Sequence, residues 1–112
     1  PLGRQILAGC AAEMMVLKTS AYRNAWAIQQ KGMPGPEGST LKVFWSELDQ
    51  RIKSAAIEIL GPGALVQEGD PAAVDDGYWA YEALWSRAAT IYAGTSEVQR
   101  NIIANRVLGL PR

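Results

Sequence analysis

The residues best suited to chemistry lie near the C-terminus, where positions 91 to 100 read Ile-Tyr-Ala-Gly-Thr-Ser-Glu-Val-Gln-Arg. Gly94 permits backbone shapes that other residues resist, and Thr95 and Ser96 carry hydroxyls that can cap a helix. Ser96 and Gln99 also fit the Ser-x-x-Gln capping box. A helix that begins with free amide groups and hydroxyls is suited to holding an anionic or polar ligand. The stretch therefore predicts a ligand-facing turn followed by a helix.

Helices must position this turn, because apolar residues recur every three or four positions along most of the chain. The expected helices cover about residues 2–30, a stretch from between 36 and 40 to about 60, about 77–90 and about 96–108. Glycine and proline clusters separate them, residues 64–77 form a loop, and no stretch alternates as a half-buried strand does. The sequence thus predicts an all-α fold, an antiparallel bundle of about four helices in which residues 1–112 form a single domain.

Side chains near the expected helix ends are candidate caps. Ser39 is a candidate for the second helix, and Asp75 or Asp76 for the third. Gly109 and Pro111 are expected to stop the last helix. The apolar face expected for that helix consists of Val98, Ile102, Val107 and Leu108.

Composition excludes several kinds of function. The net charge is zero, so the chain lacks the excess positive charge typical of proteins that bind nucleic acid or an anionic membrane. The chain has no histidine, which excludes imidazole metal sites and Ser-His or Cys-His nucleophiles within it, and we expect no metal site. Cys10 is the single cysteine, so no internal disulfide can form, and its apolar neighbours favour a buried, inert thiol. No apolar run is long enough to span a bilayer, and a cytoplasmic protein is the simplest expectation.

The C-terminal stretch resembles the C-terminal signature of the acyl-CoA dehydrogenase family, flavoenzymes that oxidise acyl-CoA thioesters. The family pattern runs roughly Tyr-(Glu or Gly)-Gly-Thr-Ser-(Glu or Gln)-(Ile or Val)-Gln-Arg, and Tyr92 and residues 94–100 match it in register. The chain begins at Pro1 without an initiator Met, so we expect a fragment of something longer or a tag remnant at residues 1–3. By the resemblance it is most of the C-terminal helical domain.

The resemblance implies an activity for the full-length protein. It would bind FAD, oxidise an acyl-CoA substrate of fatty acid or lipid metabolism to the α,β-unsaturated thioester, and pass electrons to an electron-transfer flavoprotein. It would assemble through this domain as a homo- or hetero-oligomer, whereas the fragment alone would be inactive. Tyr92, Ala93 and Gly94 fall where the family turn meets the substrate.

One departure from the family pattern concerns the catalytic base. In many members the Glu directly before Gly-Thr removes the α-proton, whereas this sequence has Ala93, whose methyl group cannot accept a proton. The base can come from an earlier helix of the domain that this sequence does not include. Alternatively, the chain is a non-catalytic subunit of a hetero-oligomer that completes a partner's flavin site. No catalytic residue can be named from this sequence.

The resemblance also implies residues for cofactor binding. Thr95 and Glu97 would face the dinucleotide, although both also suit plain helix capping and the helix dipole. Gly61 matches a family position whose backbone approaches the FAD of a neighbouring subunit. There Glu58 stands where Gln is common, and Pro62 stands where a second Gly is common. Pro62 has no N–H to donate, which puts this half of the contact in doubt.

Two further groups of side chains lie near the signature. Five aromatic rings crowd into residues 78–92: Tyr78, Trp79, Tyr81, Trp85 and Tyr92. They can form a packing seam, or line a ligand cavity or subunit contact. Arg87 and Arg100 can each pair with Glu97 or meet a phosphate, and a surface ion pair is the default.

Overall fold

The computed structural model describes residues 2–111, which contain four α-helices and no β-strand. The helices are α1 (Leu2–Lys31), α2 (Glu37–Leu60), α3 (Tyr78–Trp85) and α4 (Ser96–Ile102). Short 3₁₀ segments, Gly61–Leu65 (η1), Val74–Gly77 (η2) and Ser86–Thr90 (η3), flank α3, and a π-helical turn, Ile103–Val107 (η4), extends α4. The all-α fold expected from the periodicity is confirmed.

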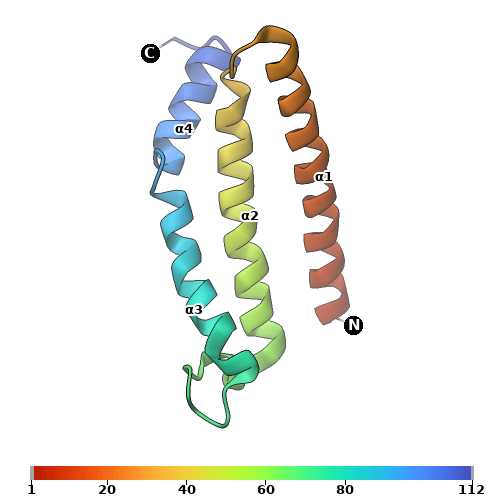
Figure 1. Ribbon diagram of the computed structural model, residues 1–112, viewed down its shortest axis with the longest axis vertical. Coiled ribbons are helices and arrows are strands. Elements are labelled where there is room, and N and C mark those ends of the chain that lie inside the picture. Colours follow the sequence, from red (N-terminus) through yellow and green to blue (C-terminus); the bar gives the residue numbers. More distant parts are fainter. Residues whose placement is uncertain (1, 112) are drawn as a thin grey trace.

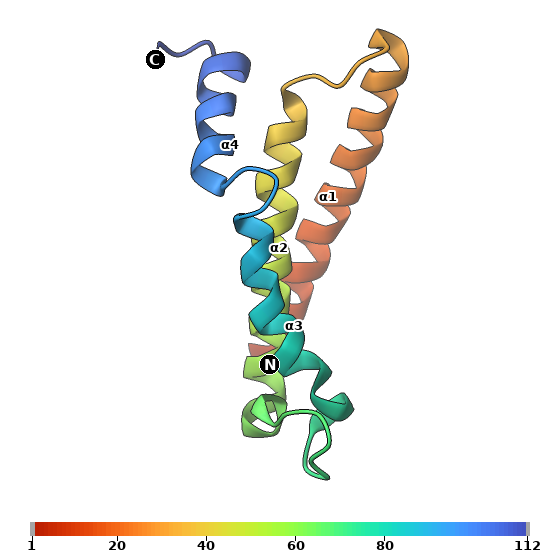
Figure 2. The same cartoon turned by 60° about the vertical axis from the view of Figure 1, so that its left-hand side comes forward.

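Helix α2 is the centre of the arrangement. α1 runs antiparallel along one side of α2, while α3 and α4 follow one another along its other side (Figure 1). In Figure 2 the column of α3 and η3 lies in front of α2, and a short turn joins it to α4. The four helices therefore form three columns, and the turn that joins α3 to α4 lies beside the N-terminal half of α2, at Lys42 and Trp45.

Glycines end the two long helices as the sequence predicts. Gly32 has φ 74° and donates its amide to Ile28 O at 2.8 Å. Gly61 has φ 72° and donates its amide to Ile57 O. A positive φ is accessible to glycine without the Cβ clash that other residues suffer, so each glycine stops a helix cleanly.

The predicted caps of α2 and α3 are wrong. α2 begins one residue after Pro36, and Ser39 lies within its first turn, where its amide bonds Pro36 O at 3.0 Å. The residue before α3 is Gly77, in the left-handed region, and no side chain caps that helix. Asp75 instead accepts from Trp79 Nε1 at 2.7 Å, and Asp76 accepts from the Gly69 amide at 3.0 Å. Neither carboxylate thus caps the backbone of α3: Asp75 contacts a side chain of its first turn, and Asp76 stabilises the preceding loop.

Few apolar side chains are buried within the described residues. The buried apolar residues are Leu48, Ala55, Ala64 and Ala89. α1 has no buried residue, and large side chains such as Met15 and Trp26 are well exposed on it. The radius of gyration is 17.2 Å, against about 13 Å for a compact domain of 100 residues. Residues 2–111 therefore form an elongated bundle with much apolar surface facing outward. None of the helices in this range is long and apolar enough to cross a membrane.

Candidate functional site

The turn between η3 and α4 adopts the special backbone that the sequence predicts. Ala93 has φ 53° and Gly94 has φ 90°, both in the left-handed region. A Cβ added at Gly94 would lie 2.7 Å from Gln99 Nε2. Glycine is therefore needed at position 94 for two reasons, its positive φ and the close approach of Gln99. Ala93 holds a conformation that L-residues adopt at a cost, which indicates that its surroundings fix the turn.

Helix α4 begins with Thr95 as its cap. The Thr95 hydroxyl oxygen accepts from the Val98 amide at 3.3 Å, and the Gln99 amide donates to Thr95 O at 2.9 Å. The predicted capping box of Ser96 and Gln99 is wrong, because Ser96 is already the first helical residue and the Gln99 side chain donates to Ala93 O at 2.8 Å. Ser96 Oγ is buried and has no hydrogen-bond partner within residues 2–111.

The apolar face predicted for α4 is also wrong in part. Val98, Val107 and Leu108 are exposed, and Ile102 is half-buried. The buried residues of α4 are the polar Ser96 and Gln99. The buried side of α4 is therefore polar, and it holds the turn because Gln99 donates a hydrogen bond to Ala93 O.

Glu97 is fully exposed at the start of α4. A hydrogen bond from its own backbone amide, followed by one from the Thr95 hydroxyl, lowers the pKa of the Glu97 carboxyl below its usual value, and Arg100 adds a smaller attraction. The carboxylate is therefore charged at neutral pH, and Thr95 both caps the helix and orients Glu97.

Two residues of α2 anchor the turn, and sequence reasoning missed both. Lys42 donates from Nζ to Gly94 O at 2.7 Å. The Trp45 ring lies 6.4 Å from the Tyr92 ring, centroid to centroid. About fifty residues separate each pair along the chain, so no local pattern could have shown either contact. The roles of Lys42 and Trp45 appear only once the fold brings α2 against the turn.

The predicted site residues fall into two groups. Tyr92, Ala93, Gly94, Thr95 and Glu97 lie together on the turn and the first turn of α4. Gly61 lies at the far end of α2, where its amide donates a hydrogen bond to Ile57 O. Sixteen residues of α2 separate Gly61 from the level of the turn at Trp45, or about 24 Å at 1.5 Å per residue. Gly61 and Thr95 of one chain therefore cannot hold the same small group.

The two arginines near the signature pair with α2 rather than with Glu97. Arg87 donates to Gln50 Oε1 and to Ser54 Oγ, each at 3.2 Å. Arg100 forms an ion pair with Glu47. Both contacts fasten the third column of helices to α2 along its length.

Lys53 fastens α3 to α2 through a small charge cluster. Its Nζ lies 2.9 Å from Asp49 Oδ2 and 2.6 Å from Glu82 Oε2, and the Lys53 side chain is only 15% exposed. Burial opposes the charged form, but the hydrogen bonds to Glu82 and Asp49 outweigh it and raise the pKa of Lys53 above 10.5. Lys53 therefore stays charged at neutral pH.

The crowded aromatic rings are mostly exposed within this chain. Tyr78, Tyr81 and Trp85 are each more than half exposed, and Tyr92 is 46% exposed. Tyr81 and Trp85 stack on each other with centroids 6.5 Å apart. Of the two interpretations, a seam buried inside this chain does not fit these exposures, which favour a contact with something outside residues 2–111.

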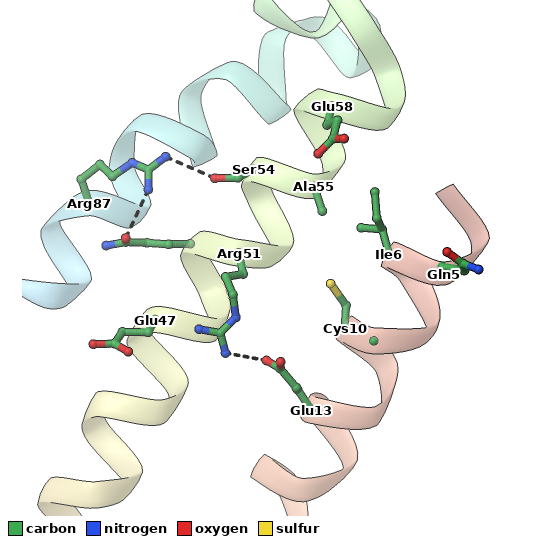
Figure 3. Close-up of a pocket in the computed structure, with 12 residues that line it drawn as sticks. Gln5, Ile6, Cys10, Glu13, Glu47, Arg51, Ser54, Ala55, Glu58 and Arg87 are labelled. Carbon is green, nitrogen blue, oxygen red and sulfur yellow. Dashed lines mark hydrogen bonds and ion pairs between the residues drawn. The ribbon is translucent and has the colours of Figure 1, made fainter. Parts of the chain in front are cut away.

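An open cavity of about 530 Å³ lies between α1, α2 and η3, away from the turn. Figure 3 shows Arg51 of α2 reaching across it to Glu13 of α1, while Arg87 reaches Ser54 on the other side. The half-buried Cys10 lines the same cavity. No predicted site residue lies there, and two of its charged groups, Arg51 and Glu13, pair with each other. Within residues 2–111 no three His, Cys, Asp or Glu side chains gather as metal ligands.

Comparison with known proteins identifies relatives over almost the whole chain. The family model described as acyl-CoA dehydrogenase, C-terminal domain, matches residues 1–108. The chain is 38% identical over 87 residues to the acyl-CoA dehydrogenase IpdE1 of Mycobacterium tuberculosis. The matched region covers 77% of this chain and 20% of that protein. It is 39% identical over 88 residues to IpdE1 of Mycolicibacterium smegmatis, covering 79% of this chain and 21% of that protein. The chain thus spans about a fifth of the length of these relatives.

Solved structures share the arrangement of helices. The ChsE4–ChsE5 complex from Mycobacterium tuberculosis matches with a TM-score of 0.86 and 33% identity, over 98% of this chain and 28% of that chain. A structure described as the Tcur3481–Tcur3483 steroid acyl-CoA dehydrogenase matches with a TM-score of 0.91 over 100% of this chain and 29% of that chain. The identity in the second case is 23%, so that likeness concerns the fold alone.

Proposed function

The chain belongs to the acyl-CoA dehydrogenase family, and we propose that the full-length protein oxidises an acyl-CoA thioester to its α,β-unsaturated form with bound FAD. On this proposal residues 1–112 are one domain of a longer polypeptide, most of the C-terminal helical domain. An electron-transfer flavoprotein would take up the electrons, and the enzyme would work in the cytoplasm in fatty acid or lipid metabolism. The fragment alone would be inactive.

The reaction needs two groups on opposite faces of the substrate. A base removes the proton α to the thioester carbonyl, and FAD, when bound, accepts the β-hydrogen as hydride. The part we assign to this chain is one wall of the pocket that holds the substrate and the flavin. Tyr92, Ala93 and Gly94 would lie against the acyl group, while Thr95 and Glu97 would face the dinucleotide.

The single observation that carries the proposal is the turn that opens onto α4. It combines two left-handed residues, a capping hydroxyl at Thr95 and a buried Ser96 hydroxyl that finds no partner among residues 2–111. A buried polar atom without a partner is costly, and a ligand that supplies one would satisfy it. The exposed Glu97 carboxylate would repel a pyrophosphate but can accept from a ribose hydroxyl or an adenine amino group. These residues fit the sugar or base side of the cofactor.

The second predicted contact, at Gly61, fits FAD less well. The Gly61 amide already bonds Ile57 O, and Pro62 has no amide hydrogen. The backbone at residues 61 and 62 therefore has no free donor for a phosphate. If this segment meets a cofactor held by another subunit, it does so through a carbonyl or by packing.

A second candidate function is supported by position 93. Ala93 stands where many family members carry the base, and it is exposed on the turn. In this candidate the chain belongs to a non-catalytic subunit that completes the flavin site of a different chain. The ChsE4–ChsE5 structure is described as a complex of two differently named chains, which supports a hetero-oligomer as one form of the proposal.

The test uses the full-length protein, purified alone and together with any chain that co-purifies with it. The first function expects visible flavin absorbance and acyl-CoA dependent reduction of an electron acceptor in the protein alone. The second expects activity only in the mixture. Ala93→Glu separates the two further, because added turnover requires that the native site lacks a base. A full-length protein that binds no flavin in either preparation would refute both.

A further inference from the structure

The turn at residues 92–94 carries backbone carbonyls that no helix uses. Ala93 O and Gly94 O lie between η3 and α4, at residues with φ 53° and 90°. Backbone carbonyls outside regular structure need donors when they are shielded from water. What supplies those donors decides how firmly the turn is held.

Each of these two carbonyls accepts a hydrogen bond from one side chain. Gln99 donates to Ala93 O at 2.8 Å from within α4, five residues after Gly94. Lys42 donates to Gly94 O at 2.7 Å from α2, 52 residues away in sequence. Gln99 ties the turn to the helix that follows it, whereas Lys42 ties it to the central helix of the fold.

Lys42 differs from the other half-buried lysine of α2. Lys53 pairs with two carboxylates, Asp49 and Glu82. The ion pairs found within residues 2–111 do not include Lys42, whose recorded partner is the neutral carbonyl of Gly94. A hydrogen bond with a charged donor is stronger than one between neutral groups, so this contact holds Gly94 more firmly than an amide would.

We propose that Lys42 is a positioning residue for the active-site turn, which holds Gly94, and through it Ala93 and Thr95, at a fixed place against α2. This inference rests on the proposed function, because the turn is the wall that we assign to the acyl group and the flavin. Trp45, one helical turn further along α2, packs near Tyr92 and anchors the other side of the same turn. A displacement of about 1 Å in such a wall can lower a reaction rate by up to about 10²-fold.

The test replaces Lys42 in the full-length protein, with its partner subunit if it has one. Lys42→Met keeps the length of the side chain but removes the donor. Lys42→Arg keeps a cationic donor and should rescue. Lys53→Met is the matched control, because it removes a half-buried lysine of the same helix that contacts α3 rather than the turn. Lys42→Gln, polar and too short to reach Gly94 O, serves if Lys42→Met does not fold.

The first readout is hydrogen exchange of the Val98 and Gln99 amides, which bond Thr95 and so report on opening of the turn. Lys42→Met should speed their exchange about tenfold, equivalent to about 1.4 kcal/mol. Lys42→Arg should exchange within about threefold of the unaltered protein, and Lys53→Met should speed the α3 amides more than these two. Unchanged Val98 and Gln99 exchange in Lys42→Met would overturn the proposal.

The second readout is catalysis. Lys42→Met should lower kcat by about tenfold or more while flavin stays bound, and Lys42→Arg should restore most of it. Normal kcat in Lys42→Met would also overturn the inference. If the unaltered protein and its partner show no dehydrogenation, the proposed function fails. Hydrogen exchange then still decides whether Lys42 holds the turn.

Discussion

Gly94→Ala tests the geometry of the turn by adding a single methyl group. Gly94 has φ 90°, and a Cβ there would lie 2.7 Å from Gln99 Nε2 and 3.9 Å from Val98 Cγ1. The Val98 contact is ordinary, whereas the Gln99 contact forces that side chain to move. Gln99 is buried and donates to Ala93 O, so it cannot move without breaking that hydrogen bond.

The expected cost has two parts. An L-residue in the left-handed region costs roughly 1–2 kcal/mol. Displacing the Gln99 side chain leaves a buried donor or acceptor without its partner, which costs about 1–3 kcal/mol. Gly94→Ala should therefore lower the free energy of unfolding by about 2–5 kcal/mol. With a urea slope of about 2 kcal/mol per molar, the midpoint should fall by about 1–2.5 M.

Urea unfolding followed by tryptophan fluorescence measures this, with two controls. Gly32→Ala has a similar φ of 74° but no atom within 4 Å of the added Cβ, so it should show only the backbone part of the cost. In a Gln99→Ala background, Gly94→Ala should likewise cost only the backbone part. If Gly94→Ala costs no more than Gly32→Ala, or costs the same with and without Gln99, then the contact with Gln99 is not what requires glycine.

Three further predictions concern the cap and the charged groups. Thr95→Val removes the oxygen that accepts from the Val98 amide and should cost about 1 kcal/mol in unfolding experiments; it should also weaken FAD retention, whereas unchanged flavin occupancy would show that the hydroxyl has no cofactor role. The pKa of Lys53 is raised in the folded protein, so its contribution to stability is complete below about pH 10 and is lost as pH rises through the folded value. Lys53→Met should remove this loss of stability at alkaline pH. An unfolding free energy that depends on pH as it does in the unaltered protein would contradict the prediction. The pKa of Glu97 is lowered, so its contribution to stability is present above about pH 4.5 and is lost as pH falls through the folded value. The stability of Glu97→Gln should therefore lack this decrease at acid pH. A decrease equal to that of the unaltered protein would count against the Thr95 contact.

The sequence predicted the helices well because their signals are local. Periodic apolar residues gave α1 and α2 to within a few residues, and Gly32 and Gly61 end them as expected. The aligned signature predicted the start of α4 after Gly94 for the same reason. Periodicity and glycine placement depend only on neighbours in the chain, so they can be read without the fold.

The caps and contacts were harder to predict because several residues compete for each role. Asp75 and Asp76 are good caps by type, but the Trp79 indole and the Gly69 amide take their carboxylates. Ser96 and Gln99 match a capping box, yet Thr95 caps the helix one position earlier. These outcomes depend on tertiary geometry, which sequence spacing does not contain.

The polar residues of α2 show a second limit. This helix carries five polar residues whose partners sequence spacing does not show: Lys42, Glu47, Gln50, Arg51 and Lys53. In the structure each of them bonds another segment of the same chain. The central position of α2 explains this, because a helix with neighbours on two sides has little free surface. Which faces of a helix are covered depends on the packing of all the columns, and one helix alone does not determine it.

The most direct test of the whole account is a structure of the intact, FAD-bound protein with any partner subunit. We expect the turn at Tyr92–Gly94 to line the flavin and acyl-CoA pocket, with Thr95 or Glu97 within about 3 Å of a polar atom of the cofactor. If that structure places both residues more than about 10 Å from every bound FAD, beyond the reach of direct or single-water contact, the central claim is wrong.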